Sequence, residues 1–428
     1  MTGHDQPLSQ PKPPSEYTPR AWGVITGATL SLFCSVGFIN SFGVFQEYYL
    51  QHQLKNESES TVAWLGGVST FFTLFGSVVS GSLMDLFGPR LIILVGSLGT
   101  IFAIMMTSLC HAFWQFILAQ GFLMGMCMSL LVVPMVALVG QYIKVKRAAA
   151  IGIIISGSSL GGVVWPIVIN ELLKKESVGF GWTMRIVGFI MLPLLTVTCT
   201  LCRPAPKAAE PAAAQTDSES SAATETKPAP QRRPDFSVLN RPTVRLACLG
   251  FFITYFGMFA PFFFTTSYAV HEGFSDDLAF YTVSIVNGAS MFGRIIPGII
   301  ADKYGRFNLC IPATFMSGVI ALCWTKATSV AGLVIWCLAY GFTSGAILSL
   351  QQVCAVQIST PQTVGLTVGA VMASASFSAM ASVPISGELI GSYGYLALSL
   401  YTGVSLIVGS FLLLLARLAQ DKRLLAVV

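Results

Sequence analysis

The stretch "VNGASMFGRIIPGIIADKYGRFN" (Val286–Asn308) holds one arginine inside an apolar run and a compact charged turn directly after it. The apolar run begins near Leu278, and Arg294 lies well inside it. Asp302 and Arg306 belong to the turn that follows. A charge buried alone is costly, so Arg294 needs either a partner or a polar cavity.

Composition predicts that such runs lie in a membrane. The chain has 428 residues, of which 54% are hydrophobic and 10% are charged, and its mean hydropathy is +0.72. Soluble chains carry about 25% charged residues, so this chain has too few to cover a water-facing surface. A run of about 20 apolar residues spans a bilayer as one helix.

Twelve runs of this kind occur along the chain, six on each side of a long polar segment. They lie near Trp22–Phe45, Thr61–Leu83, Leu91–Leu109, Trp114–Val139, Ala148–Asn170, Trp182–Cys202, Pro242–Thr265, Leu278–Ala301, Leu309–Thr325, Ala331–Val356, Val364–Gly387 and Tyr395–Ala416. We therefore predict an all-α membrane protein with twelve transmembrane helices in two pseudo-symmetric six-helix bundles.

The polar segments give the domain boundaries. Residues 1–21 are polar and proline-rich, which predicts a disordered cytosolic tail without a cleavable signal peptide. Residues 203–241 mix Pro, Ala, Ser, Thr and Glu and cannot bury a core, which predicts a disordered cytosolic linker. The two bundles then cover residues 22–202 and 242–416, and residues 417–428 form a cytosolic C-terminal tail.

Lysine and arginine predict the orientation. With the N-terminus placed in the cytosol, 18 of the 24 basic residues fall in cytosolic segments and 5 in outer segments. Positive charge favours the cytosolic side, so both termini are predicted to be cytosolic, and the plasma membrane is the expected location. The net charge of +5 is thereby explained without a nucleic-acid partner.

The two halves repeat each other. "GSLMDLFGPR" follows the second run and "GIIADKYGRF" follows the eighth. An offset of 217 residues relates Gly81 to Gly298, Asp85 to Asp302, Gly88 to Gly305, Gly152 to Gly369 and Glu171 to Glu388. Transporters are commonly built from such repeats, with the substrate site between them.

The G-x-x-x-D-x-x-G pattern of these turns resembles the signature loop of the major facilitator superfamily. In the first copy Leu86 stands in place of Lys303, and the arginine is displaced to Arg90. The resemblance implies bundles that rock about a central cavity and a carboxylate that holds the cytosolic side shut at a helix end. The implied gating residues are Gly81, Asp85, Gly88, Arg90, Gly298, Asp302, Gly305 and Arg306. The alternative is a turn that only anchors the helix end in water.

A narrower resemblance concerns the first and fifth helices. "YIKVKRAAAIGIIISGSSLGG" (Tyr142–Gly162) is similar to the fifth-helix signature of monocarboxylate porters, and "SFGVFQEYY" (Ser41–Tyr49) looks like their fungal branch. That branch includes importers and exporters of riboflavin, carboxylates and secondary metabolites. The resemblance implies alternating-access transport of an organic, carboxylate-bearing solute, and the aromatic stretch Phe251–Phe264 favours a fairly hydrophobic one. A transporter-like nutrient sensor is the alternative.

Arg294 is the first candidate for solute binding. Helical spacing places it on one face with Asn287 and Ser290. In the monocarboxylate porters the matching arginine binds the substrate carboxylate, and a guanidinium suits a planar anion. The alternative is a structural arginine paired with helix carbonyls.

Two departures from that family concern proton coupling. Ser290 replaces the acidic residue one turn before the arginine, and Asn40 replaces a lysine of the first helix. We therefore expect weak or absent proton coupling, and we count Asn40 among the solute-binding candidates. Tyr255 and Gln351 are further polar candidates, with helix packing as their alternative role.

The remaining residue types indicate no enzyme, metal or cofactor. The four histidines are scattered and the ten cysteines lie mainly inside apolar runs. Asn56-Glu57-Ser58 forms a glycosylation sequon in a predicted outer loop, with an unmodified Asn56 as the alternative. The expected partners are one organic solute and the lipid bilayer, with a monomeric functional unit.

The predicted topology can be tested by labelling single cysteines in intact cells. A membrane-impermeant maleimide should react with Ser58→Cys in the outer loop and should not react with Ser218→Cys in the linker. Permeabilised cells control for the reactivity of each thiol. The reverse pattern would contradict the predicted orientation.

Overall fold

The computed structural model describes residues 17–204 and 236–423, apart from residues 176 and 360–362, and this part of the chain is helical without strands. The first half contains α1 (Pro19–Cys34), α2 (Val36–Ile39), α3 (Phe42–Gln51), α4 (Glu59–Phe87), α5 (Pro89–Thr107), α6 (Phe113–Phe116), the π-helix η1 (Ile117–Leu123), α7 (Met124–Tyr142), α8 (Arg147–Leu173) and α9 (Gly179–Leu201). The second half contains the 3₁₀-helix η2 (Phe236–Asn240), α10 (Pro242–Met258), α11 (Ala260–His271), α12 (Asp276–Tyr304), α13 (Arg306–Leu322), the 3₁₀-helix η3 (Trp324–Lys326), α14 (Val330–Gln357) and α15 (Val364–Gln420).

The helices are those of a multi-pass membrane protein. Ten helical stretches in the described residues are long and apolar enough to cross a membrane. The two predicted crossings that remain are accounted for by α13 and by the division of α15. The apolar helix α13 has 17 residues, and α15 has 57 residues with the non-helical Gly394 (φ 76°) inside it. Since about 20 residues suffice for one crossing, α15 consists of two membrane helices joined at Gly394.

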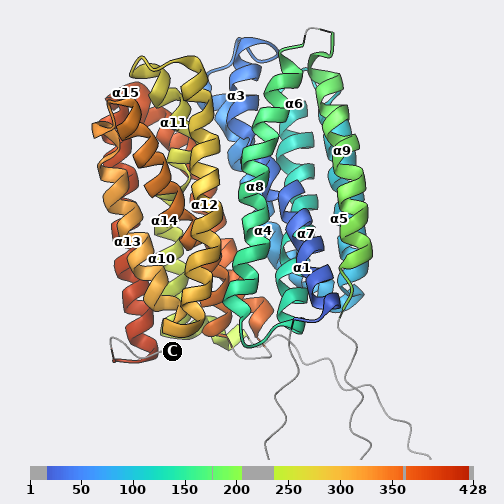
Figure 1. The fold of residues 1–428 in the computed structure, drawn as a ribbon, viewed down its shortest axis with the longest axis vertical. Helices are drawn as coiled ribbons and strands as arrows, with labels where there is room; N and C mark the ends of the chain where they lie inside the picture. The colour runs from blue at the N-terminus through green and yellow to red at the C-terminus, as the bar shows by residue number, and fades with distance from the viewer. Residues whose placement is uncertain (1–16, 176, 205–235, 360–362, 424–428) are drawn as a thin grey trace, which may run out of the picture.

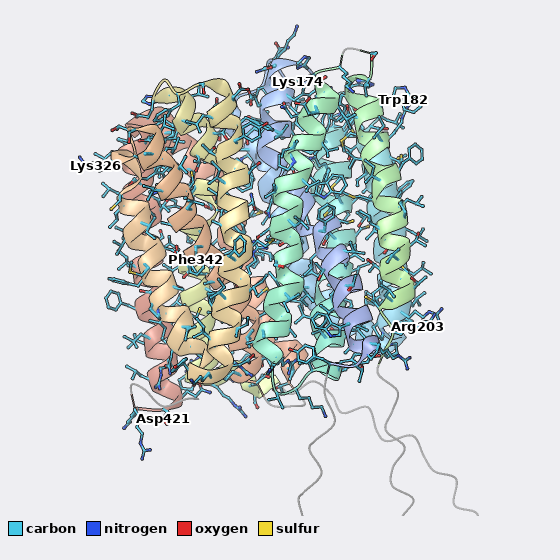
Figure 2. The ribbon with its side chains drawn as sticks, viewed as in Figure 1. Lys174, Trp182, Arg203, Lys326, Phe342 and Asp421 are labelled. Atoms are coloured by element: carbon cyan, nitrogen blue, oxygen red, sulfur yellow. The ribbon has the colours of Figure 1, made fainter. Side chains whose placement is uncertain are left out.

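The two halves form separate bundles that stand side by side, with α1–α9 in one and α10–α15 in the other (Figure 1). Arg203 and Asp421 lie at one end of the molecule, whereas Lys174, Trp182 and Lys326 lie at the opposite end (Figure 2). We call the end with Arg203 and Asp421 the terminal face and the opposite end the far face.

Three local features differ from the expected pattern. The first crossing is interrupted at Ser35 (ψ −88°) and again before Ser41, and the seventh is interrupted at Phe259. The end of the predicted disordered linker is ordered, because the apolar sequence of η2 buries Val238. Residues 205–235 of that linker, and the tail before residue 17, lie outside the described residues.

Two seams join the bundles, and glycine allows close approach at both. At the seam between α8 and α12, a Cβ on Gly298 would lie 2.8 Å from the carbonyl oxygen of Ala148. A Cβ on Gly152 would overlap the carbonyl oxygen of Arg294. At the seam between α4 and α15, a Cβ on Gly67 would lie 2.8 Å from the carbonyl oxygen of Met380, whereas Gly369, the counterpart of Gly152, faces Val78 at an ordinary contact distance of 3.5 Å. Small residues that let backbones approach are typical of helix contacts in membranes.

Gly152→Ala should destabilise the protein by about 1–3 kcal/mol, because the added methyl group meets rigid backbone at the α8–α12 seam. The matched control is Gly288→Ala on α12, where a Cβ would meet no atom within 4 Å. Alanine favours a helix over glycine by about 1 kcal/mol, so the control should be neutral or slightly stabilising. Thermal unfolding midpoints in detergent compare the two. Equal midpoints would contradict the close packing.

Candidate functional site

A carboxylate caps a helix of the opposite bundle at the terminal face. Asp302, in the last turn of α12, accepts hydrogen bonds from the backbone N–H groups of Ala148 and Ala149, each at 3.0 Å. These groups belong to the first turn of α8, where free N–H donors and the helix dipole favour a negative charge. One carboxylate therefore holds α12 against α8 across the seam.

The neighbouring glycines of the second motif copy make this contact possible. Gly298 lies one turn before Asp302 and leaves room for the α8 backbone. Gly305 follows with φ 94°, which favours glycine, and lets the chain leave α12 and enter α13 directly. Arg306 does not pair with Asp302. It is half-buried and lies close enough to Arg147 for their positive charges to repel.

The first motif copy has the same backbone form. Gly88 ends α4 and begins α5 with φ 79°, as Gly305 does between α12 and α13. Gly81 lies 217 residues before Gly298, and its Cβ position is 4.0 Å from Val133. Arg90 is exposed. The Asp85 side chain lies outside the described part of the structure, so its predicted gating contact stays a prediction.

Arg294 is buried at the same seam, deeper between the bundles. Its side chain is 1% exposed, and its Nη1 donates to the carbonyl oxygen of Ile155 at 2.8 Å and to the Ser158 hydroxyl. Both partners belong to α8 of the other bundle. The Nε atom of Arg294 is buried and has no hydrogen-bond partner among the described residues. The guanidinium therefore anchors α12 to α8 through Nη1 and leaves its buried Nε donor unused.

The predicted polar stripe on α12 does gather between the bundles. The Nδ2 atom of Asn40 lies 3.5 Å from Oδ1 of Asn287 and also donates to the carbonyl oxygen of Ser158 at 3.3 Å. Asn287 is fully buried and donates to its own helix at Val283. Ser290 is buried as well, and its hydroxyl finds no partner in the described chain. Asn40 thus bridges both bundles.

Tyr255 and Gln351 form a separate pair inside the second bundle. The Tyr255 hydroxyl donates to Oε1 of Gln351 at 2.5 Å, and both side chains are buried. Gln351 also contacts the sulfur of Met372 at 3.9 Å. Tyr255 interacts electrostatically with Arg294, so the pair lies next to the stripe on α12. Its observed contacts are those of helix packing.

Sequence reasoning did not single out the two α8 groups that hold Arg294. Ser158 lies in "GIIISGSSLGG", whose small residues indicate close packing and do not distinguish a packing serine from a hydrogen-bonding one. The Ile155 acceptor is a backbone carbonyl, which no side-chain pattern can reveal. The available signal was Arg294 itself, because an arginine inside an apolar run requires some hydrogen-bond acceptor.

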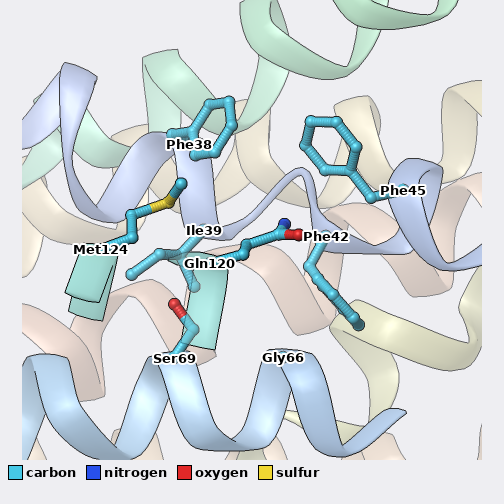
Figure 3. A pocket seen from close by; sticks show the side chains of 8 residues that line it. All are labelled: Phe38, Ile39, Phe42, Phe45, Gly66, Ser69, Gln120 and Met124. Carbon is cyan, nitrogen blue, oxygen red and sulfur yellow. The ribbon is translucent and has the colours of Figure 1, made fainter. Parts of the chain in front are cut away.

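Gln120 is a second buried polar residue that the sequence did not reveal. It lies in the π-helix η1, where it accepts a hydrogen bond from the Tyr49 hydroxyl at 2.7 Å. Figure 3 shows Gln120 among the side chains that line a small cavity, with its amide directed toward Phe42 and with Phe38 and Ser69 also in the lining. The volume of this cavity is about 10 Å³. That volume holds about one water molecule and is too small for an organic solute. π-Helical turns are frequent at functional sites.

The buried charged side chains of the described residues are both positive. Among the described residues, the buried charged side chains are Arg294 and Arg417, and Arg417 bonds Asn308 near the terminal face. Glu171 and Glu388 are exposed. The described residues contain no cluster of His, Cys, Asp and Glu that could hold a metal ion.

Asn56 lies exposed in the turn between α3 and α4. The sequon is therefore accessible, and its modification stays a prediction.

Known proteins similar to this chain are membrane transporters. A family model of the Major Facilitator Superfamily matches residues 28–339. The agnestins efflux protein AgnL12 of Paecilomyces divaricatus is 45% identical over 416 residues, which cover 97% of this chain and 91% of that protein. The aspyridones efflux protein apdF of Emericella nidulans is 38% identical over 409 residues, covering 95% of this chain and 79% of that protein.

A solved structure shares the fold. The crystal structure of the human organic anion transporter MFSD10 (TETRAN) matches with a TM-score of 0.67 at 14% identity, covering 93% of this chain and 100% of that chain. The matched family and the relatives are transporters and not enzymes.

Asp302→Asn should weaken closure of the terminal face while it preserves the shape of the side chain. Loss of a partly buried charge at a helix N-terminus costs about 1–2 kcal/mol, or roughly a 5- to 30-fold shift toward an open seam. Solute turnover should fall more than the amount of protein in the membrane. Glu57→Gln, an exposed carboxylate at the far face, is the control. Unchanged turnover at a normal protein level would leave Asp302 only an anchoring role.

Proposed function

This chain belongs to the Major Facilitator Superfamily, and we propose that it exports an organic anion with a large apolar part by alternating access. The names of two relatives, an agnestins efflux protein and an aspyridones efflux protein, support export of a secondary metabolite. The anionic character of the solute is inferred from the side chains between the two bundles.

The observation that carries the proposal is a pair of unused polar groups on α12. Nε of Arg294 and the hydroxyl of Ser290 are buried without partners in the described chain, four residues apart on one helical face. Leaving a buried donor unpaired costs about 1–3 kcal/mol, more for a charged group. A bound carboxylate would satisfy both groups, and charge-assisted bonds of this kind are strong.

The same arginine would link solute binding to movement. One nitrogen of Arg294 already binds α8, so a carboxylate that draws the guanidinium away weakens the α8–α12 contact. A ligand shifts an equilibrium only by its different affinity for the two states. Here the difference would arise because Arg294 gives up its hydrogen bonds to the Ile155 carbonyl and the Ser158 hydroxyl and binds the solute carboxylate instead.

Aromatic side chains near the stripe support an apolar body for the solute. Phe259 lies 5.4 Å from Tyr255, and Phe263 contacts Phe42 of the other bundle at 6.1 Å between ring centroids. Tyr255, Phe259 and Phe263 belong to the stretch Phe251–Phe264, in which Phe251 and Phe264 are buried and Phe259 and Phe263 are partly buried. Flat apolar rings bury well against such walls.

Orientation, location and energy source belong to the same proposal. The excess of Lys and Arg supports a cytosolic terminal face, and we place the protein in the plasma membrane. The lack of a buried acid in the described residues supports transport without proton coupling through the bundle interior. The resemblance to monocarboxylate porters fits an arginine on the eighth crossing and remains part of the proposal.

Arginine 294 variants test the binding role. Metabolite profiling of cells and medium, with and without the gene, first identifies the solute. In vesicles, Arg294→Lys should lower the apparent affinity because the planar fork is lost. Arg294→Ala should lower it by about 30-fold or more, since removing one partner of a buried charge pair costs at least about 2 kcal/mol. Arg245→Lys, exposed at the start of α10, is the control.

Ser158→Ala separates binding from structural support. It removes one α8 partner of Arg294 and leaves the guanidinium in place, so apparent affinity should hold or rise. If Arg294 is only structural, both the Arg294 and the Ser158 variants should lose stability with no change in affinity.

Full activity of Arg294→Ala would refute the binding role. Uphill accumulation driven by an imposed pH gradient would refute transport without protons, and solute binding without transport would favour a sensor.

A further inference from the structure

A pocket opens at the terminal face where three helices from both bundles meet. Its volume is about 610 Å³, and it lies between the start of α1, the start of α8 and the end of α12. Trp22, Ile153 and Ile299 are among its apolar lining residues, and Lys146, Lys303 and Asp302 are its charged lining residues. The adjacency of α8 and α12 is visible in Figure 1. Unlike the candidate solute site, this pocket lies on the outside of the molecule.

The two lysines outnumber the one carboxylate at this pocket. Lys146 immediately precedes α8 in the first bundle, and Lys303 lies in the last turn of α12 in the second. Both are exposed, and neither forms an ion pair within the residues that the structure describes. The Asp302 carboxylate is directed to the backbone of α8 instead. Lys303 lies over the ring of Tyr304, 5.1 Å from its centroid.

The apolar side of the pocket continues into the surface that faces lipid. Trp22 is 48% exposed and Ile299 is 55% exposed, although both lie on membrane-crossing helices. Large apolar side chains exposed on such helices contact acyl chains. A tryptophan at the end of a crossing is typical of the depth where headgroups begin. The pocket therefore joins a cationic region to an apolar wall at headgroup level.

We propose that this pocket binds an anionic phospholipid, with its phosphate between Lys146 and Lys303 and an acyl chain along Trp22 and Ile299. A membrane lipid fits better than a soluble anion, because only a lipid also covers the apolar wall. One lysine belongs to each bundle, so the bound headgroup bridges the seam beside Asp302. The lipid thereby favours the closed terminal face. This site stands independently of the identity of the transported solute.

Lipid retention in nanodiscs tests the site. The purified full chain is placed in discs of phosphatidylcholine mixed with phosphatidylserine, released, and examined by native mass spectrometry. Wild type should retain phosphatidylserine over phosphatidylcholine. A lysine near an anionic headgroup contributes roughly a factor of 5 in affinity, so Lys146→Gln/Lys303→Gln should lose about 30-fold. Lys175→Gln/Lys326→Gln, which removes two exposed lysines at the far face, should retain the lipid.

Two further measurements decide the proposal. Trp22→Ala should weaken retention while it keeps both lysines, which a purely ionic site would not show. Soluble glycerophosphoserine should fail to displace the lipid. Equal retention by wild type and the Lys146→Gln/Lys303→Gln variant, with both proteins folded by thermal unfolding, would overturn the proposal. Displacement by glycerophosphoserine at similar concentration would also overturn it, because the site would then recognise a free phosphate.

Discussion

The close approach of α8 and α12 is the constraint on which the rest of the seam depends. Gly152 and Gly298 bring the two backbones together, since a methyl group at either position would meet a carbonyl oxygen. This proximity lets the short Asp302 side chain reach the first N–H groups of α8. It also puts the α8 acceptors within reach of Arg294, whose burial would otherwise be too costly. Packing, capping and charge burial are thus consequences of one helix crossing.

Much of this arrangement was predictable because it depends on residue type and spacing. The motif that contains Asp302 predicted a carboxylate facing the end of a neighbouring helix, and in the structure that helix is α8. Arg294 in an apolar run required hydrogen-bond partners, and it has them. The family and the helical bundles are confirmed. The solute-binding roles of Arg294 and Asn287 and the gating role of Asp302 stay predictions.

Other features were not accessible from one-dimensional patterns. The π-helix η1 arises from a change in backbone register, which leaves the apolar composition of Ile117–Leu123 unaltered. Ser158 looks like a packing residue in the sequence because it is small and lies among other small residues. In the structure its hydroxyl also accepts a hydrogen bond from Arg294. The apolar start of the second half, Phe236–Asn240, was hidden by the composition of the linker before it. In each case the deciding partner lies on another element or in the backbone.

The interruptions of the first and seventh crossings have a mechanical consequence. The first crossing restarts at Phe42 and the seventh breaks at Phe259, which are counterparts at the same offset of 217 residues. A helix break removes part of the i→i−4 ladder, so each crossing is less stiff at that depth than an unbroken helix. Beyond the breaks, α3 and α11 meet through Phe42 and Phe263. Short segments that can bend therefore meet between the bundles toward the far face, whereas the seam at the terminal face is formed by the long helices α8 and α12.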